Sequence, residues 1–524
     1  MSGTQNKSQE WSPGANPWLI AVVVTLAAFM EVLDTTIVNV SLPHIAGNLS
    51  TSYDDASWAL TSYLAANGIV LTISGWLSRL FGRKRYFLIC IGMFTVCSFL
   101  CGISSNLGEL IVFRLLQGFF GGGLQPTQQS IILDTFPPEK RGAAFGLTAI
   151  ATVVAPVLGP TLGGYITDNA SWRWVFFINI PVGLFALMAV AALVQDPPWA
   201  QQKKSPVDYI GLGLIALGLG CLEVMMDRGE DDDWFGSPFI CLMGLFTVIG
   251  ILGAIGWLLV AKRPAVELRV LNDRNFAVGS MAISVVGVVL YASAVVIPQF
   301  SQQVIGYTAT LAGLVLSPGG LGIIVLIPFV GRLMKVVQTR YIIAFGFFVM
   351  GSSLVYSAHL VLNIDFTHLV MYRLSQTVSL GFLFVPISTI AYQTIPRELR
   401  GDASALFSMF RNVFGAVGIS LAQSQVTERT QVREAHIVHW MTPFHQPFNE
   451  YLSRSEAVLQ RLGRPATELQ AQAQQHLHQQ FIMQASTLAY NDVFMIFSVV
   501  AFAMVPFCFL LRPARGGGGG GGGH

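Results

Sequence analysis

Apolar runs of about twenty residues recur along the whole chain, separated by short polar segments. A helix that rises about 1.5 Å per residue needs about twenty residues to cross a hydrocarbon core about 30 Å thick. Because lipid offers no partner for exposed backbone groups, the runs predict an all-α polytopic membrane protein. We count about fourteen, with approximate centres at Ala28, Ile69, Met93, Phe120, Val154, Phe185, Leu217, Phe246, Val286, Pro318, Val349, Phe382, Phe414 and Val499.

The composition excludes an ordinary soluble protein. Hydrophobic residues make up 53% of the 524 positions and charged residues 11%, whereas about a quarter of a soluble globular chain is charged. The net charge of +2 gives no sign of a nucleic-acid partner, and the lipid bilayer is the partner that this composition predicts. The six cysteines lie in or beside apolar runs without a CxxC pair, so we interpret them as small hydrophobic side chains.

Lysine and arginine are distributed unevenly between the loops. If the N-terminus is cytoplasmic, the loops on that side hold basic clusters such as 79–85 and 262–274, and Arg512 follows the last span. The short loops on the opposite side hold only Arg173 and Arg228, apart from a few residues in the long segment before the last span. This asymmetry predicts that both termini are cytoplasmic.

Two distant parts of the chain repeat one pattern at a single offset. The matched pairs are Arg114/Arg373, Gln117/Gln376, Glu139/Glu398, Arg141/Arg400 and Gly142/Gly401. The repeat predicts two related six-helix halves with two helices inserted between them, an arrangement suited to rocking around a central site. Architectural duplication alone is the alternative, but charges embedded at matched places favour transport.

The predicted organisation follows from these spans and this repeat. It consists of a cytoplasmic tail 1–17, an N-terminal half 18–195, two inserted helices 208–261, a C-terminal half 275–511 that includes a periplasmic helical insertion 426–487 before the last helix, and a cytoplasmic Gly-rich tail 512–524.

The first apolar run, 18–43, carries two acidic residues, Glu31 and Asp34. An ionisable side chain near the bilayer centre costs about 3 kcal/mol on insertion scales, so such residues usually face a cavity, find a partner and take part in ion movement. Asp34 is therefore our leading candidate for a proton-carrying residue. Glu31, one turn earlier on the same face, could share or replace this role. The alternative places both acids near a helix end, within reach of the headgroups.

Arg114 in the fourth run is a candidate partner for Asp34. The first span runs outward and the fourth inward, and a rise of about 1.5 Å per residue puts both side chains in the outer half of the membrane. An adjacent guanidinium favours ionised Asp34, whereas apolar burial favours its protonated form. Movement of Arg114 would therefore couple conformation to proton binding, with the proton as coupling ion and no other cofactor.

Four segments in order resemble the signatures of a known family. They are LDTTIVNVSLP (33–43), GWLSRLFGRKR (75–85), LIVFRLLQGFFGGG (110–123) and Gly146 with APVLGPTLGG (155–164). Together they resemble the major facilitator superfamily, within it the fourteen-helix drug:proton antiporters, and most of all the EmrB-type multidrug exporters. The resemblance covers nearly the whole chain. It implies proton-driven export of small hydrophobic or amphiphilic toxic compounds across the bacterial inner membrane, together with a periplasmic membrane-fusion adaptor and an outer-membrane channel.

Two of these segments are candidate gating elements. Glycine and proline in the fifth span permit close helix approach and a bend, although an ordinary small-residue packing seam is the alternative. The candidate residues of this antiporter motif are Gly146, Pro156, Gly159, Pro160, Gly163 and Gly164. Those of the cytoplasmic loop motif are Gly75, Arg79, Gly82, Arg83 and Lys84.

The chain departs from the family pattern at two of these positions. Arg79 stands where the family usually has an acid, which argues against a cytoplasmic gate that depends on the charge partners of that acid. Ala155 stands where a glycine is common, and it is small enough to keep the close packing. The basic loop itself is as well explained by topology anchoring as by gating.

Several polar residues inside the predicted spans are candidates for a substrate cavity. Arg373 and Arg411 could attract anionic or amphiphilic substrates, or instead bond a neighbouring helix carbonyl. Polar contacts that hold helices together are the alternative for the others as well. The full candidate set is Asn67, Gln117, Gln125, Gln128, Arg373, Gln376, Tyr392, Arg411 and Asn412.

The segment before the last span is rich in glutamine and histidine. SRSEAVLQRL (453–462) and PATELQAQAQQHLHQQF (465–481) predict two amphipathic helices. They could dock a partner, or form a flap that belongs to the transporter alone. His476 and His478 have no acid or cysteine companions at ligand spacing, so we expect no metal site. The terminal 516–523 glycine tract predicts a flexible tail, of native or artificial origin.

Three classes of function compete. A proton-driven exporter explains the acid in the first span, the bend motif and the outer segment. A proton-coupled uptake symporter of a small organic solute is the alternative, but it gives no reason for the antiporter motif. A membrane enzyme would need a reactive constellation, and the chain has no GxxxxGK[ST], HExxH or GxSxG pattern. We therefore expect a secondary active transporter rather than an enzyme.

Overall fold

The computed structural model describes residues 13–200, 207–439, 441–442, 444–462, 465 and 468–512. Within these residues the chain forms helices, turns and loops without a β-strand. Thirteen helices are long and apolar enough to cross a membrane, or 14 spans when the bent α6 is included. The prediction of an all-α protein with about fourteen spans is therefore confirmed.

The helices follow the predicted spans closely. In the N-terminal part they are α1 (Pro17–Asn48), α2 (Tyr53–Phe81), α3 (Arg83–Ile103), α4 (Leu107–Gly121), α5 (Leu124–Thr135), α6 (Pro138–Asn169), α7 (Trp174–Phe177) and α8 (Asn179–Leu193). The inserted pair is α9 (Tyr209–Arg228) and α10 (Pro238–Val260). The C-terminal part has α11 (Arg274–Gln303), α12 (Ala309–Leu333), α13 (Thr339–Ser357), α14 (Phe366–Ala391), α15 (Arg400–Val438), α16 (Gln446–Arg461) and α17 (Leu469–Cys508). Short 3-10 turns are η1 (Pro198–Ala200), η2 (Trp234–Gly236), η3 (Leu268–Asn272) and η4 (Arg397–Leu399).

Side-chain caps and prolines explain where several helices begin and bend. Ser52, Asp273 and Asp365 each accept a backbone N–H from the first turn of the helix that follows, which satisfies donors that have no partner inside a helix. α6 bends by 40° between Pro156 and Leu158, where proline removes a backbone donor and crowds the preceding turn.

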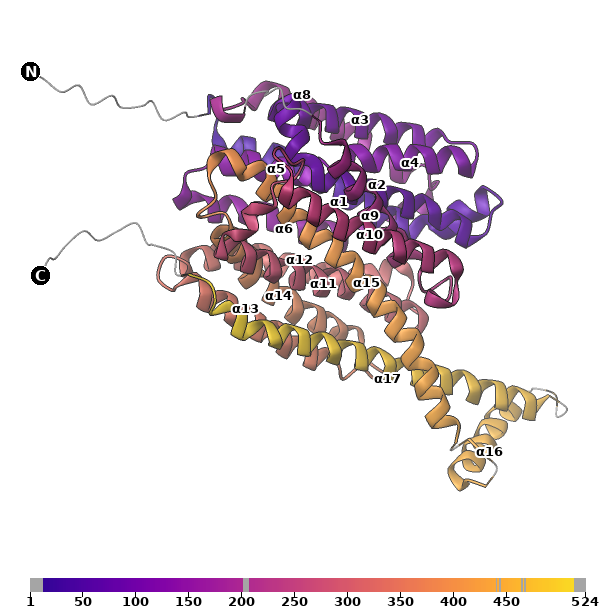
Figure 1. Ribbon diagram of the computed structural model, residues 1–524. Helices are drawn as coiled ribbons and strands as arrows, with labels where there is room; N and C mark the ends of the chain where they lie inside the picture. Colours follow the sequence, from indigo (N-terminus) through magenta and orange to yellow (C-terminus); the bar gives the residue numbers. More distant parts are fainter. Residues whose placement is uncertain are drawn as a thin grey trace, which may run out of the picture.

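The six N-terminal spans and the six C-terminal spans form two bundles that lie side by side (Figure 1). α6 packs along α12, and α2 packs against α15, so each of these two seams joins one half to the other. The inserted helices α9 and α10 pack against one another, and α9 lies on α2. The inserted pair thus covers the α2 side of the N-terminal half.

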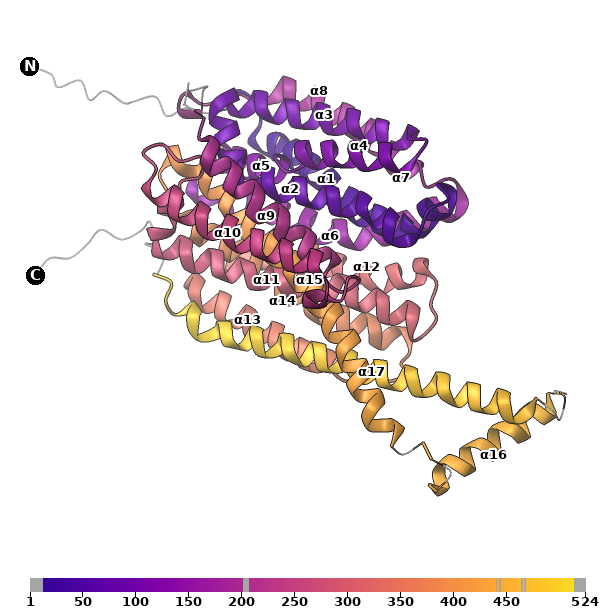
Figure 2. The ribbon, with the colours of Figure 1, turned by 45° about the vertical axis from the view of Figure 1, so that its right-hand side comes forward.

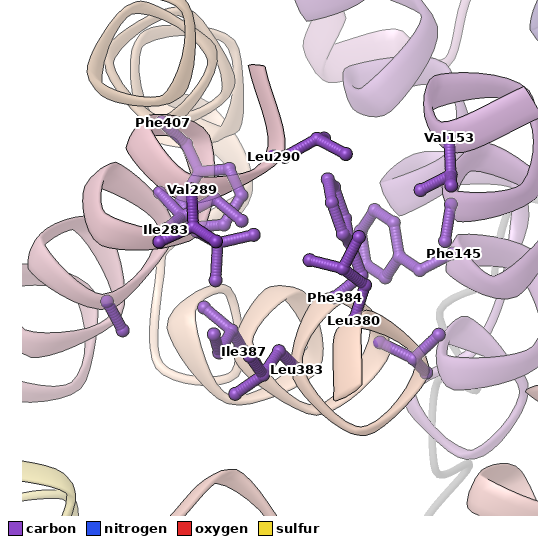
Figure 3. Packing of buried hydrophobic residues seen from close by; sticks show 14 of the residues in the cluster. Phe145, Val153, Ile283, Val289, Leu290, Leu380, Leu383, Phe384, Ile387 and Phe407 are labelled. Carbon is purple, nitrogen blue, oxygen red and sulfur yellow. The ribbon is translucent and has the colours of Figure 1, made fainter. Parts of the chain in front are cut away.

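Apolar side chains from both halves meet at the centre of the molecule. Figure 3 shows Phe145 and Val153 of α6 facing Leu380 and Phe384 of α14, with Leu290 of α11 beside them. These residues are all buried. This apolar interface holds the halves together through hydrophobic packing, which does not depend on directional bonds.

The two ends of the bundle differ. α1 begins and α17 ends at one end, which also carries the helix ends with Arg79, Arg83 and Arg400; we call it the basic end (Figure 1). At the opposite end, the last turns of α15, α16 and the first turns of α17 project beyond the bundle as a helical arm (Figures 1 and 2). The cytoplasmic placement of the basic end remains a prediction.

The arm differs in one respect from the sequence expectation. The first expected amphipathic helix is part of α16, but the second does not end before the last span. It continues into that span as one 40-residue helix, α17, because no proline or glycine interrupts 469–505.

Candidate functional site

Asp34 lies fully buried in α1 and is bonded to polar groups from two other helices, α4 and α8. Its Oδ2 accepts from Nη1 of Arg114 at 2.5 Å, and both side chains are 0% exposed. Its Oδ1 accepts from Nδ2 of Asn179 at 2.7 Å and from Nε2 of Gln117 at 3.1 Å. The predicted pair of Asp34 and Arg114 therefore meets directly, and the two amides complete the carboxylate's bonds.

Arg114 is held from several sides besides Asp34. Its Nη1 donates to Oε1 of Gln117 at 2.8 Å and its Nε to the carbonyl of Ala59 at 3.2 Å. The Tyr63 ring lies under the guanidinium, with its centroid 4.0 Å from Cζ, a distance suited to a cation–π contact. Gln117 belongs to this cluster and does not line the central cavity described below.

Glu31 forms a second buried cluster one turn away. Its Oε1 accepts from Nδ2 of Asn67 at 2.9 Å and, at 3.5 Å, from the hydroxyl of Tyr63. Its Oε2 accepts from Nε2 of Gln125 at 2.5 Å. Since the Tyr63 ring also stacks on Arg114, Tyr63 connects the Glu31 cluster with the Asp34 cluster.

The Glu31 cluster continues into the other half of the molecule. Oε1 of Gln125 accepts from Nη2 of Arg411, which belongs to α15. Arg411 in turn donates from Nε to Oδ1 of Asn412 at 3.1 Å, and the hydroxyl of Tyr291 donates to the same oxygen at 3.3 Å. A continuous chain of polar contacts thus runs from Asp34 through Tyr63, Glu31 and Gln125 to the C-terminal half.

A small cavity lies beside this chain, between the two halves. The cavity volume is about 10 Å³, far below the ~300–1,000 Å³ typical of pockets for drug-sized ligands. A drug-sized substrate therefore requires the halves to separate. The cavity is lined by Thr25, Ala28, Val32, Gln125, Gln128, Gln129, Thr148, Ala151, Thr152 and Arg411.

Only part of the predicted cavity set lines this space. Gln125, Gln128 and Arg411 do, and Nε2 of Gln128 donates to the hydroxyls of Thr25 at 3.1 Å and Thr148 at 2.7 Å. The threonines of α1 and α6 were not singled out from the sequence, because a hydroxyl in a membrane helix commonly bonds its own backbone instead.

The other predicted cavity residues lie elsewhere. Asn67 and Asn412 belong to the Glu31 and Arg411 clusters described above. Tyr392 lies nearer the basic end, where its hydroxyl donates to Oε1 of Gln129 at 2.9 Å across the two halves. Arg373 and Gln376 are buried inside the C-terminal half, outside the lining of the central cavity.

The small residues of α6 allow close contacts on two sides of this helix. A Cβ added at Gly159 would overlap with Thr36 of α1, two residues from Asp34, and one at Gly163 would come 3.0 Å from the carbonyl of Ile37. On the other side, one added at Gly146 would come 2.5 Å from Ile327 of α12. α6 therefore connects the neighbourhood of Asp34 with the C-terminal half.

Three further residues of this motif lie near the bend. Pro156 and Gly164 are buried, and Pro160 is half-buried. Because α6 bends just after Pro156, a change in this bend would move the contacts with α1 and α12 together.

The basic end is closed by charged groups that cross between the halves. Arg79 of α2 forms an ion pair with Asp402 in the first turn of α15. Asp134 of α5 pairs with Arg83 and, at 3.1 Å, with Nη1 of Arg400. The pairing of Arg79 uses the opposite polarity to the family pattern, because here the N-terminal half supplies the cation and the C-terminal half the acid.

The remaining loop-motif residues shape this end. A Cβ added at Gly75 would come 2.9 Å from the Cα of Asp402, so only glycine lets α2 approach α15 this closely. Gly82 has a φ of 83° between α2 and α3, a value that side chains disfavour. The backbone N–H of Lys84 donates to Oδ1 of Asp196 at 2.8 Å. This hydrogen bond favours the ionised carboxylate, but burial has the larger effect and raises the pKa of Asp196 above its ordinary value.

Two acids on the inserted helix α9 were missed in the sequence analysis. Glu223 is 6% exposed and faces Gly68 of α2, and Oδ2 of Asp227 accepts from the hydroxyl of Thr61. The sequence signal was present, since both interrupt an apolar run. Among the residues that the structure describes, no cluster of histidine, cysteine and acidic side chains could hold a metal ion.

Comparisons with known proteins all lead to one family of membrane transporters. The family model of the Major Facilitator Superfamily matches residues 24–419. The chain is 34% identical to the multidrug export protein EmrB of Haemophilus influenzae over 514 residues, 98% of this chain and 99% of that protein. It is 34% identical to EmrB of Escherichia coli K12 (97% and 98% covered) and 32% identical to the fatty acid resistance protein FarB of Neisseria gonorrhoeae (94% and 96%).

Solved structures agree in fold. The human organic anion transporter MFSD10 superposes with a TM-score of 0.58 at 11% identity, covering 93% of this chain and 99% of that one. The proton:xylose symporter XylE superposes with a TM-score of 0.55 at 13% identity, covering 94% and 96%. At such identities the likeness concerns the fold alone.

Proposed function

The chain belongs to the Major Facilitator Superfamily, and we propose that it is a proton-driven antiporter that exports hydrophobic or amphiphilic toxic compounds across the bacterial inner membrane. As a member of this family it is a multi-pass membrane transporter rather than an enzyme. The export direction and the substrate class are supported by relatives whose names describe multidrug export. The basic end faces the cytoplasm in this proposal.

The observation that carries the proposal is the buried chain of contacts from Asp34 to Arg411. At one end, a carboxylate sits against a guanidinium with both side chains out of contact with solvent. At the other, Gln125 and Arg411 line the cavity between the halves. A change of charge at Asp34 therefore has a physical route to the place where a substrate would bind.

Proton uptake by Asp34 would neutralise its carboxylate, so Arg114 would lose the negative partner of its ion pair. The guanidinium stays charged, because arginine is not deprotonated in proteins, and a buried charge without a partner is strongly unfavourable. Arg114 is then driven to a new position, and Tyr63 moves with it because the ring stacks on the guanidinium. Tyr63 also donates to Glu31, so the rearrangement reaches Gln125 and Arg411.

Substrate occupancy would act on the same chain from the other side. An amphiphilic compound between Gln125 and Arg411 would break their mutual bond and leave Gln125 bonded to Glu31 alone. Proton binding from outside and substrate binding from inside would thus favour opposite conformations, as antiport requires.

We extend the proposal to a tripartite assembly. The arm projects at the end opposite the basic end (Figure 2), which is the periplasmic side in this orientation. It carries exposed apolar side chains at Phe444 and Leu462, 97% and 72% exposed. A periplasmic membrane-fusion adaptor that contacts an outer-membrane channel would cover them.

The test is proton release triggered by substrate from acidified inside-out vesicles. Asp34→Asn should abolish release with several amphiphilic drugs, whereas release should survive in Asp168→Asn, a control that removes an exposed acid of α6. Release that survives in Asp34→Asn but disappears in Glu31→Gln would move the carrier to Glu31. No release with any drug in the native protein would refute antiport and favour uptake of a small organic solute.

A further inference from the structure

The C-terminal half contains a copy of the Asp34 site that lacks its acid. The sequence offset that relates Arg114 to Arg373 and Gln117 to Gln376 also leads from Asp34 to Ser293. The structure places Arg373 and Gln376 on α14 and Ser293 on the facing helix α11. A serine therefore stands at the position equivalent to that of the proton-site carboxylate.

The hydrogen bonds of the two sites correspond. Nη1 of Arg373 donates to Oγ of Ser293 at 2.9 Å and, at 3.5 Å, to Oε1 of Gln376. In the N-terminal half, Nη1 of Arg114 makes the corresponding bonds to Asp34 and Gln117. In both halves the arginine Nη1 donates to two side chains at corresponding positions, but in the C-terminal half both acceptors are neutral.

The environment of Arg373 offers less support in other respects too. Its Nε and Nη2 are both buried without a hydrogen-bond partner, whereas Arg114 leaves only Nη2 without one, because its Nε donates to a backbone carbonyl. Gly319 of α12 lies beside Arg373, and a Cβ there would come 3.4 Å from Cγ of Arg373. In the described part of the chain, Arg373 takes part in no ion pair and no cation–π contact.

A fully buried guanidinium of this kind needs a counter-charge. Arg373 is 0% exposed, it remains protonated, and an unpaired charge inside a membrane protein is strongly disfavoured. Buried donors without a protein partner point to a bound ion or water, and only an anion also neutralises the charge.

We propose that Arg373, with Ser293 and Gln376, forms a binding site for a monovalent anion that takes the place of the missing carboxylate. The shared chemistry is one negative charge with acceptors for Nε and Nη2. It comes either from chloride in solution or from the carboxylate of a transported amphiphile. The proposal does not rest on proton coupling by Asp34 and can be tested without it.

The experiment is a thermal unfolding series on the full-length protein in detergent, followed by tryptophan fluorescence. Sodium gluconate is replaced stepwise by sodium chloride at constant ionic strength and pH, and separately by acetate or by decanoate below its micellar concentration. We expect a saturable rise in Tm. A rise with chloride assigns a resident ion, a rise with decanoate but not chloride assigns a substrate carboxylate, and no rise with any of these anions overturns the proposal.

Two variants at one position supply the matched comparison. Ser293→Asp restores an internal carboxylate, so its Tm in gluconate should exceed that of Ser293→Asn, which has the same size without the charge, and its Tm should no longer depend on the anion. Arg373→Leu should also lose the anion dependence. Equal Tm values of the two Ser293 variants in gluconate would show that Arg373 needs no counter-charge and would overturn the proposal. An anion effect that persists in Arg373→Leu would overturn it too, because the anion would then act elsewhere.

Discussion

Neutralising Arg79 should open the basic end of the transporter. Its pairing with Asp402 joins α2 to α15, with side chains 31% and 2% exposed. An exposed pair contributes up to about 1 kcal/mol, and breaking a fully buried one costs ~3–5 kcal/mol. For this half-buried pair we expect about 2 kcal/mol from Arg79→Gln, which lowers the ratio of closed to open molecules about 30-fold.

The assay is a distance distribution between spin labels on either half at this end. Arg85 on α3 and Gln393 after α14 are both exposed, and labels there should move apart in Arg79→Gln and in Asp402→Asn. The double reversal Arg79→Asp with Asp402→Arg should restore part of the closed population. Recovery is incomplete because an arginine at 402 would face the positive end of α15.

An ion pair within a single segment of the chain serves as the control. Arg269 and Glu267 lie 3.6 Å apart within one loop, so Arg269→Gln should leave the distribution unchanged. Unchanged distances in Arg79→Gln, or no recovery in the double reversal, would refute the view that this pair holds the halves together.

Three further predictions concern stability. Burial raises the pKa of Asp196 above its ordinary value, so the stability that this acid contributes is lost as pH rises through its folded pKa; the Tm of Asp196→Asn relative to the native protein should therefore rise as the pH increases above the ordinary pKa of an aspartic acid, about 3.9. Gly159→Ala should lower the stability by about 1–3 kcal/mol through overlap with Thr36, and Thr36→Ala should recover part of this loss in a denaturation curve. Arg433→Ala removes a bidentate pair with Asp492 at 2.8 Å, so hydrogen exchange at the end of α15 should quicken about 5-fold, equivalent to about 1 kcal/mol.

Each of these predictions has an internal comparison. Glu398→Gln, at an exposed acid, should not reproduce the pH-dependent gain of Asp196→Asn. Gly213→Ala should be tolerated, because a Cβ there meets nothing within 4 Å. Arg454→Ala should leave exchange at the end of α15 unchanged, since Arg454 is 82% exposed. The reasoning fails if a control behaves like its partner variant.

Local pattern sufficed for much of the fold. The apolar runs identified the spans because a membrane helix must satisfy its own backbone and expose apolar side chains over a fixed length. The depth of two charges predicted that Asp34 and Arg114 could meet, and they do, because helix rise converts sequence position into depth. Depth alone did not sort Arg373 from Arg411, although one lies inside the C-terminal half and the other lines the central cavity.

The sequence does not give the rotation of each helix about its axis, which decides which side chains of distant helices face one another. Arg79 is an apparent departure in sequence, yet the structure gives it an acid, Asp402, more than three hundred residues away. Gln125 was one polar residue among several, and only the approach of α15 makes it the contact between Glu31 and Arg411.

The sequence by itself thus determined the membrane class, the spans, the duplicated halves and the acid–arginine pair. Only the tertiary structure decided which polar groups cross between the halves, that the basic end is closed, and that no acid among the residues it describes pairs with Arg373. The physical reason is that span formation depends on local hydrophobicity and helix rise, whereas pairing between distant helices depends on packing that brings particular faces within about 3 Å.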